Sequence, residues 1–280
     1  AAGEFAIIQQ LIEGQNLQRL GKGVAGAKQI TVSFYVKGSR ASTQVCNLYE
    51  GDNNRHIGAT FSVTTDWTRV EITFPADEDD GSSPLADDNT VSIYFQIWLH
   101  AGSNFTGGTI QTTWANYVAN TTAAGIDSFF SSTDNNFFIT GVQMEVGPVA
   151  TEFEQEDYGT TLAKCQRYFQ KQIGGAGSVF ERFGSGFSNT STNFNSIIPM
   201  QTAMRAAPAL GHNGTMAHYH IYHTNTTTAL TGLSIDAGAD GPNKQVGVNA
   251  TVSSGLTEGA AGMLNGNNNG TAFISLDAEL

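Results

Sequence analysis

The sequence predicts a mostly β protein, built as a jelly-roll-like β-sandwich followed by a short linking helix and a smaller β-rich C-terminal domain. Charged residues make up only 14% of the chain while glycine occurs 32 times, a composition that favours short strands joined by turns over helices. In the first half, runs of β-branched and aromatic residues recur between turn signals. A chain of 280 residues is long enough for two domains, each with its own core.

The expected strands follow one another along the first half of the chain. They are placed near residues 5–12, 29–37, 43–49, 57–63, 67–74, 90–99 and 137–146, with loops such as GKGVAGAK, EGDNNRH and PADEDDGSSPLADDN between them. Their number and spacing are typical of a sandwich. Residues 1–150 are therefore assigned to the sandwich, 151–172 to an acidic linker with a short helix, and 173–280 to the C-terminal tip domain. Trp67 begins one strand and is expected to anchor the core.

The middle of the chain, FFITGVQMEVGPVATEFEQEDYGTTLAKCQRYFQKQ, changes from a strand pattern to a helix pattern. Its first part is interpreted as the closing strand of the sandwich, and its acidic centre as a joint stiffened by Pro148. The end is predicted to be a helix with Thr160 as N-cap and with Leu162, Cys165 and Phe169 along one apolar stripe. Cys165 and the only other cysteine, Cys46, have no metal or redox spacing and are expected to be buried.

Strand alternation predicts one candidate binding face. In TVSIYFQIWLH, the apolar residues at positions 91, 93, 95, 97 and 99 are expected to point inward, so that Tyr94, Gln96, Trp98 and His100 point outward. Aromatic rings beside amide and imidazole groups suit a sugar, because the C–H face of a pyranose stacks on a ring while its hydroxyls need donors and acceptors. The glycan-binding hypothesis therefore names Tyr35, Tyr94, Gln96, Trp98 and His100, and Tyr35 belongs to it only if its strand lies in the same sheet with the same face outward. The alternative is that a second sheet, a loop or a neighbouring subunit covers these rings.

Two metal sites are weaker hypotheses, and no cofactor is expected. The acidic loop offers enough oxygens for Ca²⁺, which takes about 6–8, through Asp77, Glu78, Asp79, Asp80, Asp87 and Asp88. In HNGTMAHYHIYH, His218 and His220 would share one face of a strand and ligate a transition metal around a threefold axis. The alternatives are a solvated acidic loop and a polar strand face.

Charge and motif content argue against several functions without excluding an enzyme. The formal net charge of −12 disfavours nucleic acid and anionic membrane surfaces, which are bound through Lys and Arg. No apolar run reaches the roughly 18 residues of a spanning helix, so membrane insertion is not expected. The GxSxG, HExxH, Walker and Rossmann patterns are absent, and the protein is not expected to be an enzyme.

The stretch ITGVQMEVGPVATEFEQEDYGTTLAKCQRYFQK, together with IIQQLIEGQNLQRLGKGVAGAKQITVSFYVKGS, resembles a module of tail fibre and related virion proteins of tailed bacteriophages. The resemblance extends over residues 5–172, and PMQTAMRAAPAL and NGTAFISLDAEL are similar to the tip region of the same proteins. It implies a carbohydrate-binding jelly roll followed by a β-rich tip, and it carries over no catalytic residues. The strands that precede FAIIQQ in the family are missing here, so the sandwich is expected to be incomplete or completed by another segment.

These observations lead to an expected function and its alternatives. The resemblance implies a tail fibre or receptor-binding protein on the exterior of a phage particle, with other virion proteins and a host cell-surface glycan as partners. A homotrimer is expected, because the Gly- and Asn-rich second half would pack better against identical neighbours than as a lone core. The alternatives are a purely structural fibre, either capsid-decorating or tail-associated, and the binding module of a secreted glycan hydrolase.

Overall fold

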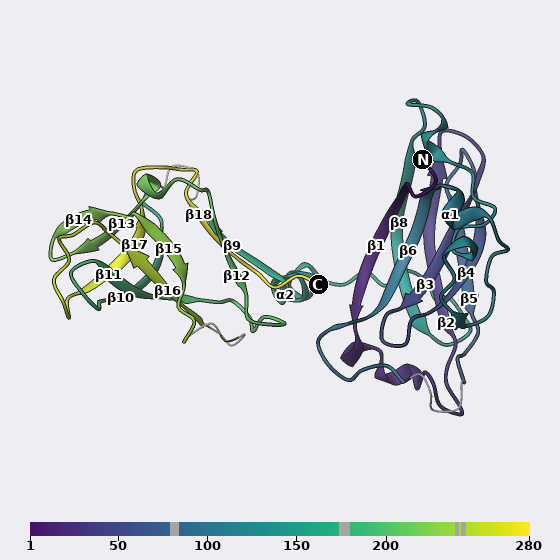
Figure 1. Cartoon of the computed structure of the whole chain (residues 1–280), viewed down its shortest axis with the longest axis horizontal. Coiled ribbons are helices and arrows are strands. Elements are labelled where there is room, and N and C mark those ends of the chain that lie inside the picture. Colours follow the sequence, from purple (N-terminus) through teal and green to yellow (C-terminus); the bar gives the residue numbers. More distant parts are fainter. Residues whose placement is uncertain (79–83, 174–179, 239–240, 242–244) are drawn as a thin grey trace. The chain divides into compact units, whose positions relative to one another are not determined.

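The computed structural model describes residues 1–78, 84–173, 180–238, 241 and 245–280. The chain forms two compact units, Ala1–Gln155 and Glu156–Leu280, and each is built from antiparallel sheets (Figure 1). The mostly β class expected from the sequence is confirmed. No helix in the described part of the chain is both long and apolar enough to cross a membrane.

The first unit is a sandwich of two unequal sheets. Sheet A has the strand order β1-β6-β3-β4-β7, and sheet B has the order β5-β2-β8. All seven predicted strands are confirmed, and only the two-residue strand β7 was missed. The elements are β1 (Phe5–Glu13), β2 (Ile30–Gly38), β3 (Ser42–Glu50), β4 (Arg55–Val63), β5 (Thr68–Phe74), β6 (Val91–Ala101), α1 (Ser103–Thr106), β7 (Ala115–Asn116) and β8 (Phe137–Val146), with 3₁₀ turns at Gly14–Asn16, Gln18–Leu20, Ala119–Thr121 and Phe129–Ser131.

Alternating residues of the facing strands fill the space between the two sheets. Ile93 and Ile97 of β6 and Phe34 of β2 are fully buried there, as the alternation predicts. The Phe34 ring meets the Phe61 ring of β4 edge-on, with centroids 5.1 Å apart. Cys46 also lies in this core, where burial raises the pKa of its thiol and leaves it unreactive.

Trp67 is not a core residue, and the sequence prediction for it is wrong. Its side chain is 48% exposed, on the outer side of sheet B. It precedes β5 at the level of Lys37, whose ammonium lies 5.2 Å from the centre of the Trp67 ring and also 5.2 Å from that of Phe138. The Trp67 ring therefore contributes a cation–π contact with Lys37 rather than a buried core side chain.

A buried ion network joins four connecting segments at one end of this sandwich. The Lys22 ammonium lies 3.1 Å from Glu50 Oε2 and 2.8 Å from Asp77 Oδ2, and the Lys22 side chain is only 3% exposed. Arg55 donates two hydrogen bonds to the same Asp77 carboxylate, at 3.1 and 2.9 Å. Lys22 also lies over the ring of Trp114, 4.7 Å from its centre. Each buried charge therefore has a partner of opposite sign, as burial requires.

Replacing Lys22 with methionine should destabilise the first unit by about 3–5 kcal/mol, because the buried Glu50 carboxylate would lose its ammonium partner and Asp77 would keep only Arg55. The three tryptophans, at 67, 98 and 114, all lie in this unit, so urea unfolding followed by tryptophan fluorescence reports on it alone. Lys28→Met removes the same charge at an exposed position and is the matched control. Equal stability of the two variants would mean that the network contributes nothing.

The acidic joint folds back over the outer face of sheet B. Thr31 and Thr73, from β2 and β5, donate hydrogen bonds to the carbonyl oxygens of Gly147 and Pro148, at 2.6 and 3.3 Å. Arg69 donates to the Thr151 carbonyl. The segment after β8 is therefore part of the first unit as far as Gln155, rather than a free linker beginning at residue 151.

Helix α2 (Tyr158–Gln166) is shorter than its sequence pattern indicated, and it clusters with the second unit. Its N-cap is Asp157, whose carboxylate accepts from the backbone N–H of Thr160 at 2.9 Å, so the prediction of Thr160 as N-cap is wrong. The helix ends before Phe169, which begins the next strand, so the predicted stripe does not form. Cys165 is exposed, contrary to expectation.

The second unit is also a sandwich, with sheet C in the order β12-β18-β9 and sheet D in the order β14-β13-β17-β10-β11-β16-β15. Tyr219, Phe183 and Phe194 are among the largest fully buried side chains of its core. Its strands are β9 (Phe169–Ile173), β10 (Arg182–Ser188), β11 (Asn193–Pro199), β12 (Ala209–His212), β13 (Tyr219–His223), β14 (Thr226–Ala229), β15 (Gly232–Ile235), β16 (Gln245–Thr251), β17 (Ala261–Gly266) and β18 (Phe273–Asp277), with a 3₁₀ turn at Met216–His218.

Candidate functional site

The outer face of sheet A holds an open pocket of about 540 Å³. Strands β1, β3 and β6 supply most of its lining, and the β3–β4 turn, α1 and the residue after β7 complete it. Its lining residues are Phe5, Ile7, Gln9, Tyr49, Asn54, Gln96, Trp98, Phe105 and Tyr117. Aromatic rings together with a few polar groups are typical of small-molecule sites.

Trp98 forms the floor of this pocket. Its ring packs against those of Phe5 and Phe105, with centroids 5.8 and 5.4 Å away, and its Nε1–H donates to Asn47 Oδ1 at 3.2 Å. The side chain is only 3% exposed, because the chain between β6 and β8 crosses over it and packs Ala123 against it. Phe5, by contrast, is 56% exposed and offers its ring to solvent.

A cluster of tyrosines forms one wall. The Tyr49 ring lies 5.3 Å from the rings of both Tyr94 and Tyr117. Burial raises the pKa of the Tyr49 phenol, and the neighbouring tyrosines and the Glu50 carboxylate add to the rise, so Tyr49 stays neutral. Tyr117 is fixed by its backbone N–H, which donates to the Asn54 carbonyl at 2.8 Å, and its ring meets that of His56 at 5.3 Å.

Amide groups supply the polar part of the pocket. Gln96 Nε2 donates to Gln9 Oε1 at 2.7 Å across the β1–β6 pair, which orients both side chains. The Tyr49 hydroxyl donates to Asn54 Oδ1 at 3.1 Å. Within the described residues, the Gln9 and Asn54 amide N–H groups and the Gln96 carbonyl oxygen take part in no other hydrogen bond. Oriented donors beside an acceptor can bind hydroxyl groups.

The structure brings together only part of the predicted binding face. Gln96 and Trp98 line the pocket, and Tyr94 lies beside it against Tyr49. His100 is turned to the end of β6, where its Nδ1 is 2.7 Å from Ser128 Oγ and its Nε2 is 3.4 Å from Glu4. Tyr35 lies on β2 of sheet B, so grouping it with the others is wrong.

The remaining lining residues were not named from the sequence. Strand parity could have found Tyr49, since it faces the same way as its cross-strand partner Tyr94, and the β1 residues Ile7 and Gln9 follow the same alternation. Phe105 lies in the four-residue helix α1 and Tyr117 in the loop after β7, and both segments are too short for a periodicity that indicates direction.

The two metal hypotheses receive no support from side-chain positions. His218 lies in a 3₁₀ turn with its Nδ1 2.8 Å from Asn213, while His220 is buried on β13, so the predicted shared strand face is wrong. Asp77 is occupied by Lys22 and Arg55, and Asp88 accepts from the backbone N–H and hydroxyl of Thr90, which lowers the pKa of its carboxyl. Asp79 and Asp80 lie outside the described residues. Among those described, no three metal-binding side chains gather.

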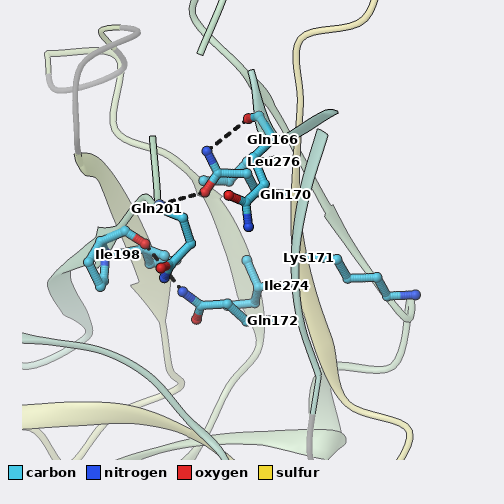
Figure 2. A pocket seen from close by; sticks show the side chains of 9 residues that line it. Gln166, Gln170, Lys171, Gln172, Ile198, Gln201, Ile274 and Leu276 are labelled. Carbon is cyan, nitrogen blue, oxygen red and sulfur yellow. Dashed lines mark hydrogen bonds between the residues drawn. The ribbon is translucent and has the colours of Figure 1, made fainter. Parts of the chain in front are cut away.

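A smaller pocket of about 80 Å³ lies in the second unit, beside β9 and β18 (Figure 2). The Gln170 side-chain amide is hydrogen-bonded to its neighbours. It donates to the carbonyls of Gln166 and Thr202 and accepts from the Gln201 backbone N–H at 2.8 Å. Figure 2 shows Lys171 pointing away from these residues. The glutamine cluster therefore attaches the chain after β11 to β9, and the space beside it suits bound water.

Comparison with known proteins gives no relative. No family model matches the sequence, and no curated protein matches it. Among solved structures, oxalate decarboxylase from Bacillus subtilis at pH 4.6 aligns with 9% identity and a TM-score of 0.11, over 100% of this chain and 73% of its own. A similarity of this size carries no inference about fold or function.

Trp98→Ala should lower the stability of the first unit by about 3–5 kcal/mol, because a covered aromatic floor would be replaced by a cavity. The measurement is urea unfolding followed by circular dichroism. Trp67→Ala, at a half-exposed position outside the core, should remove only a cation–π contact with Lys37 and lower stability by about 1 kcal/mol or less. An unfolding midpoint for Trp98→Ala equal to that of the control would show that the floor is not packed.

The first unit should lose stability as the pH falls below about 6.5, the ordinary pKa of histidine. His56 is 1% exposed behind Tyr117, and burial lowers the pKa of its imidazole, so the folded state holds it neutral while the unfolded chain binds the proton. The free energy of unfolding of the first unit therefore has its full value above about pH 6.5 and falls as the pH decreases below that value.

The test compares urea unfolding at pH 8 and pH 5.5 by tryptophan fluorescence. His56→Gln should reduce the difference between the two pH values, whereas His212→Gln, in the unit without tryptophan, should leave it unchanged. If the difference in stability between pH 8 and pH 5.5 is as large in His56→Gln as in the wild type, groups other than His56 cause it.

Proposed function

We propose that the protein is a virion adhesion protein that binds a neutral host-surface glycan through the pocket on sheet A. One observation carries the proposal: five aromatic rings and three amide side chains line a single open pocket. The Phe5 ring, which is 56% exposed, and the partly buried Tyr117 ring can stack on the C–H face of a pyranose. The Gln9–Gln96 pair and Asn54 supply donors and an acceptor for its hydroxyls.

The charge of the pocket favours a neutral sugar. None of the nine lining residues carries a formal charge at neutral pH, and the chain has a net charge of −12. A sialic or uronic acid would lose hydration of its carboxylate without gaining a cationic partner. Neutral hexoses have no such cost.

The same lining supports binding rather than catalysis. It contains no carboxylate, imidazole, thiol or aliphatic hydroxyl, the groups that would act as general acid, base or nucleophile on a glycoside. The virion setting is inferred from the resemblance of residues 5–172 to phage fibre proteins. The competing proposal, a purely structural fibre, is favoured by the cover over Trp98, which shows that part of the outward aromatic face serves packing.

Tyr117→Ala should weaken glycan binding by about 1–3 kcal/mol, since it removes one stacking surface from the pocket. A glycan array of neutral and acidic sugars identifies the ligand, and isothermal titration measures the affinity of both proteins for it. Tyr158→Ala, at a position on α2 that is 80% exposed, is the matched control. Absence of binding to every glycan by a folded protein would leave the structural fibre as the function.

A further inference from the structure

A second group of exposed aromatic rings lies on the outer face of sheet B, in the first unit. Tyr35 of β2 is 38% exposed and Phe138 of β8 is 47% exposed. Trp67, directly before β5, is 48% exposed, and Phe153 of the acidic joint is 45% exposed. Exposed apolar side chains that form one patch mark a binding surface, whereas scattered ones need no explanation.

Strand pairing places these rings at two neighbouring levels of the sheet. At the first level, Lys37 is the cross-strand partner of Phe138. Trp67 lies on its other side, because the preceding residue of β2, Val36, pairs with Thr68. The Lys37 ammonium is 5.2 Å from the centre of each ring, so this level is a cation between two aromatic side chains.

The second level lies two residues along β2 and holds Tyr35 and Phe153. A Cβ atom at Gly141 would lie 3.3 Å from Tyr35 Cδ2 and 3.7 Å from Phe153 Cδ2, so both rings pack over this glycine. The Tyr35 hydroxyl takes part in no hydrogen bond with the described residues. Residues two apart on a strand are separated by about 7 Å, a distance of the order of one sugar ring.

Lys37 is the cation of this face that no described carboxylate neutralises. The other cation, Arg69 of β5, forms an ion pair with Glu71 at 2.9 Å. Glu145 of β8 accepts from the backbone N–H and the hydroxyl of Thr151, at 3.0 and 2.6 Å. The three N–H donors of the Lys37 ammonium therefore remain able to bond to an acceptor from outside the chain.

The acidic side chains of β5 and β8 lie too far along the sheet to repel an anion at Lys37. Glu71 pairs with Ser33 and Glu145 pairs with Thr31, four and six residues from Lys37 on β2. At about 3.3 Å per residue these separations are about 13 and 20 Å, beyond the Debye length of about 8 Å at physiological ionic strength.

We propose that this face binds an acidic sugar, such as a uronic or sialic acid, at a site separate from the pocket on sheet A. The Lys37 ammonium binds the sugar carboxylate. The Tyr35 and Phe153 rings stack on the C–H face of the sugar, and the Tyr35 hydroxyl bonds to one of its hydroxyls. Phe138 and Trp67 keep the ammonium in place between them.

Charge complementarity favours a carboxylate ligand here, in contrast to the uncharged lining of the pocket on sheet A. An acidic peptide would also offer a carboxylate to Lys37. It would, however, place backbone N–H and C=O groups against the rings of Phe138 and Phe153, which cannot bond to them. A sugar presents its apolar C–H face to such rings and keeps its hydroxyls at the periphery.

A glycan array on which each acidic glycan is printed beside its carboxyl-reduced form tests the proposal on the whole chain. We expect at least one acidic glycan to bind, and its signal to be lost when the carboxylate is reduced to an alcohol. In a titration with that glycan, Lys37→Met should weaken binding by about tenfold or more, because it removes a charged hydrogen-bond donor. Lys28→Met removes the same charge at an exposed position elsewhere and should bind like the wild type.

Two further variants separate this site from the pocket on sheet A. Tyr117→Ala should leave the binding of the acidic glycan unchanged, so that failure of either proposed site can be recognised without the other. Asp66→Asn removes an exposed carboxylate next to Trp67 and should strengthen the binding of the acidic glycan.

Trp67 reports on the site directly, because it lies beside Lys37. Tryptophan fluorescence should change when the acidic glycan is added, and this change should vanish in Trp67→Phe, which keeps an aromatic ring at the position. The proposal is overturned if no acidic glycan binds, if the carboxyl-reduced forms bind equally well, or if Lys37→Met binds like the wild type. Binding of a polyglutamate peptide but of no acidic glycan would also overturn it and assign the surface to a protein partner.

Discussion

The buried ammonium of Lys22, between Glu50 and Asp77, is the constraint on which the geometry of the pocket depends. Glu50 ends β3 directly after Tyr49, and Arg55 begins β4 directly after Asn54. The network therefore holds both ends of the turn that contains the lining residue Asn54 and that follows the lining residue Tyr49. Because an unpaired charge in this position costs several kcal/mol, the turn is restricted to the arrangement that satisfies all four groups.

Aromatic residues on the outer face of sheet A have two different roles, and the chain between β6 and β8 decides which. It covers Trp98, so that this ring supports the pocket from below. The same chain adds Phe105 and Tyr117 to the pocket, and Phe5 stays open to solvent. A platform of strand residues alone would be flat, and the added rings give it walls that can enclose a ligand.

Strand β1 contributes to two faces of sheet A through its alternation. Ile7 and Gln9 face the pocket, while Ile8, the cross-strand partner of the buried Ile97, lies on the opposite face and is still 40% exposed.

Local sequence determined most of the fold, because strand patterns and turn residues act over short distances. All seven predicted strands of the first unit form, and Ile93 and Ile97 point inward as alternation requires. The binding face was only half predictable: parity indicated Gln96 and Trp98 but not which sheet holds Tyr35. Only the tertiary structure decided that Trp98 is covered, that Trp67 is exposed and that Lys22 neutralises Asp77, since each depends on residues far apart in the chain that meet only after folding.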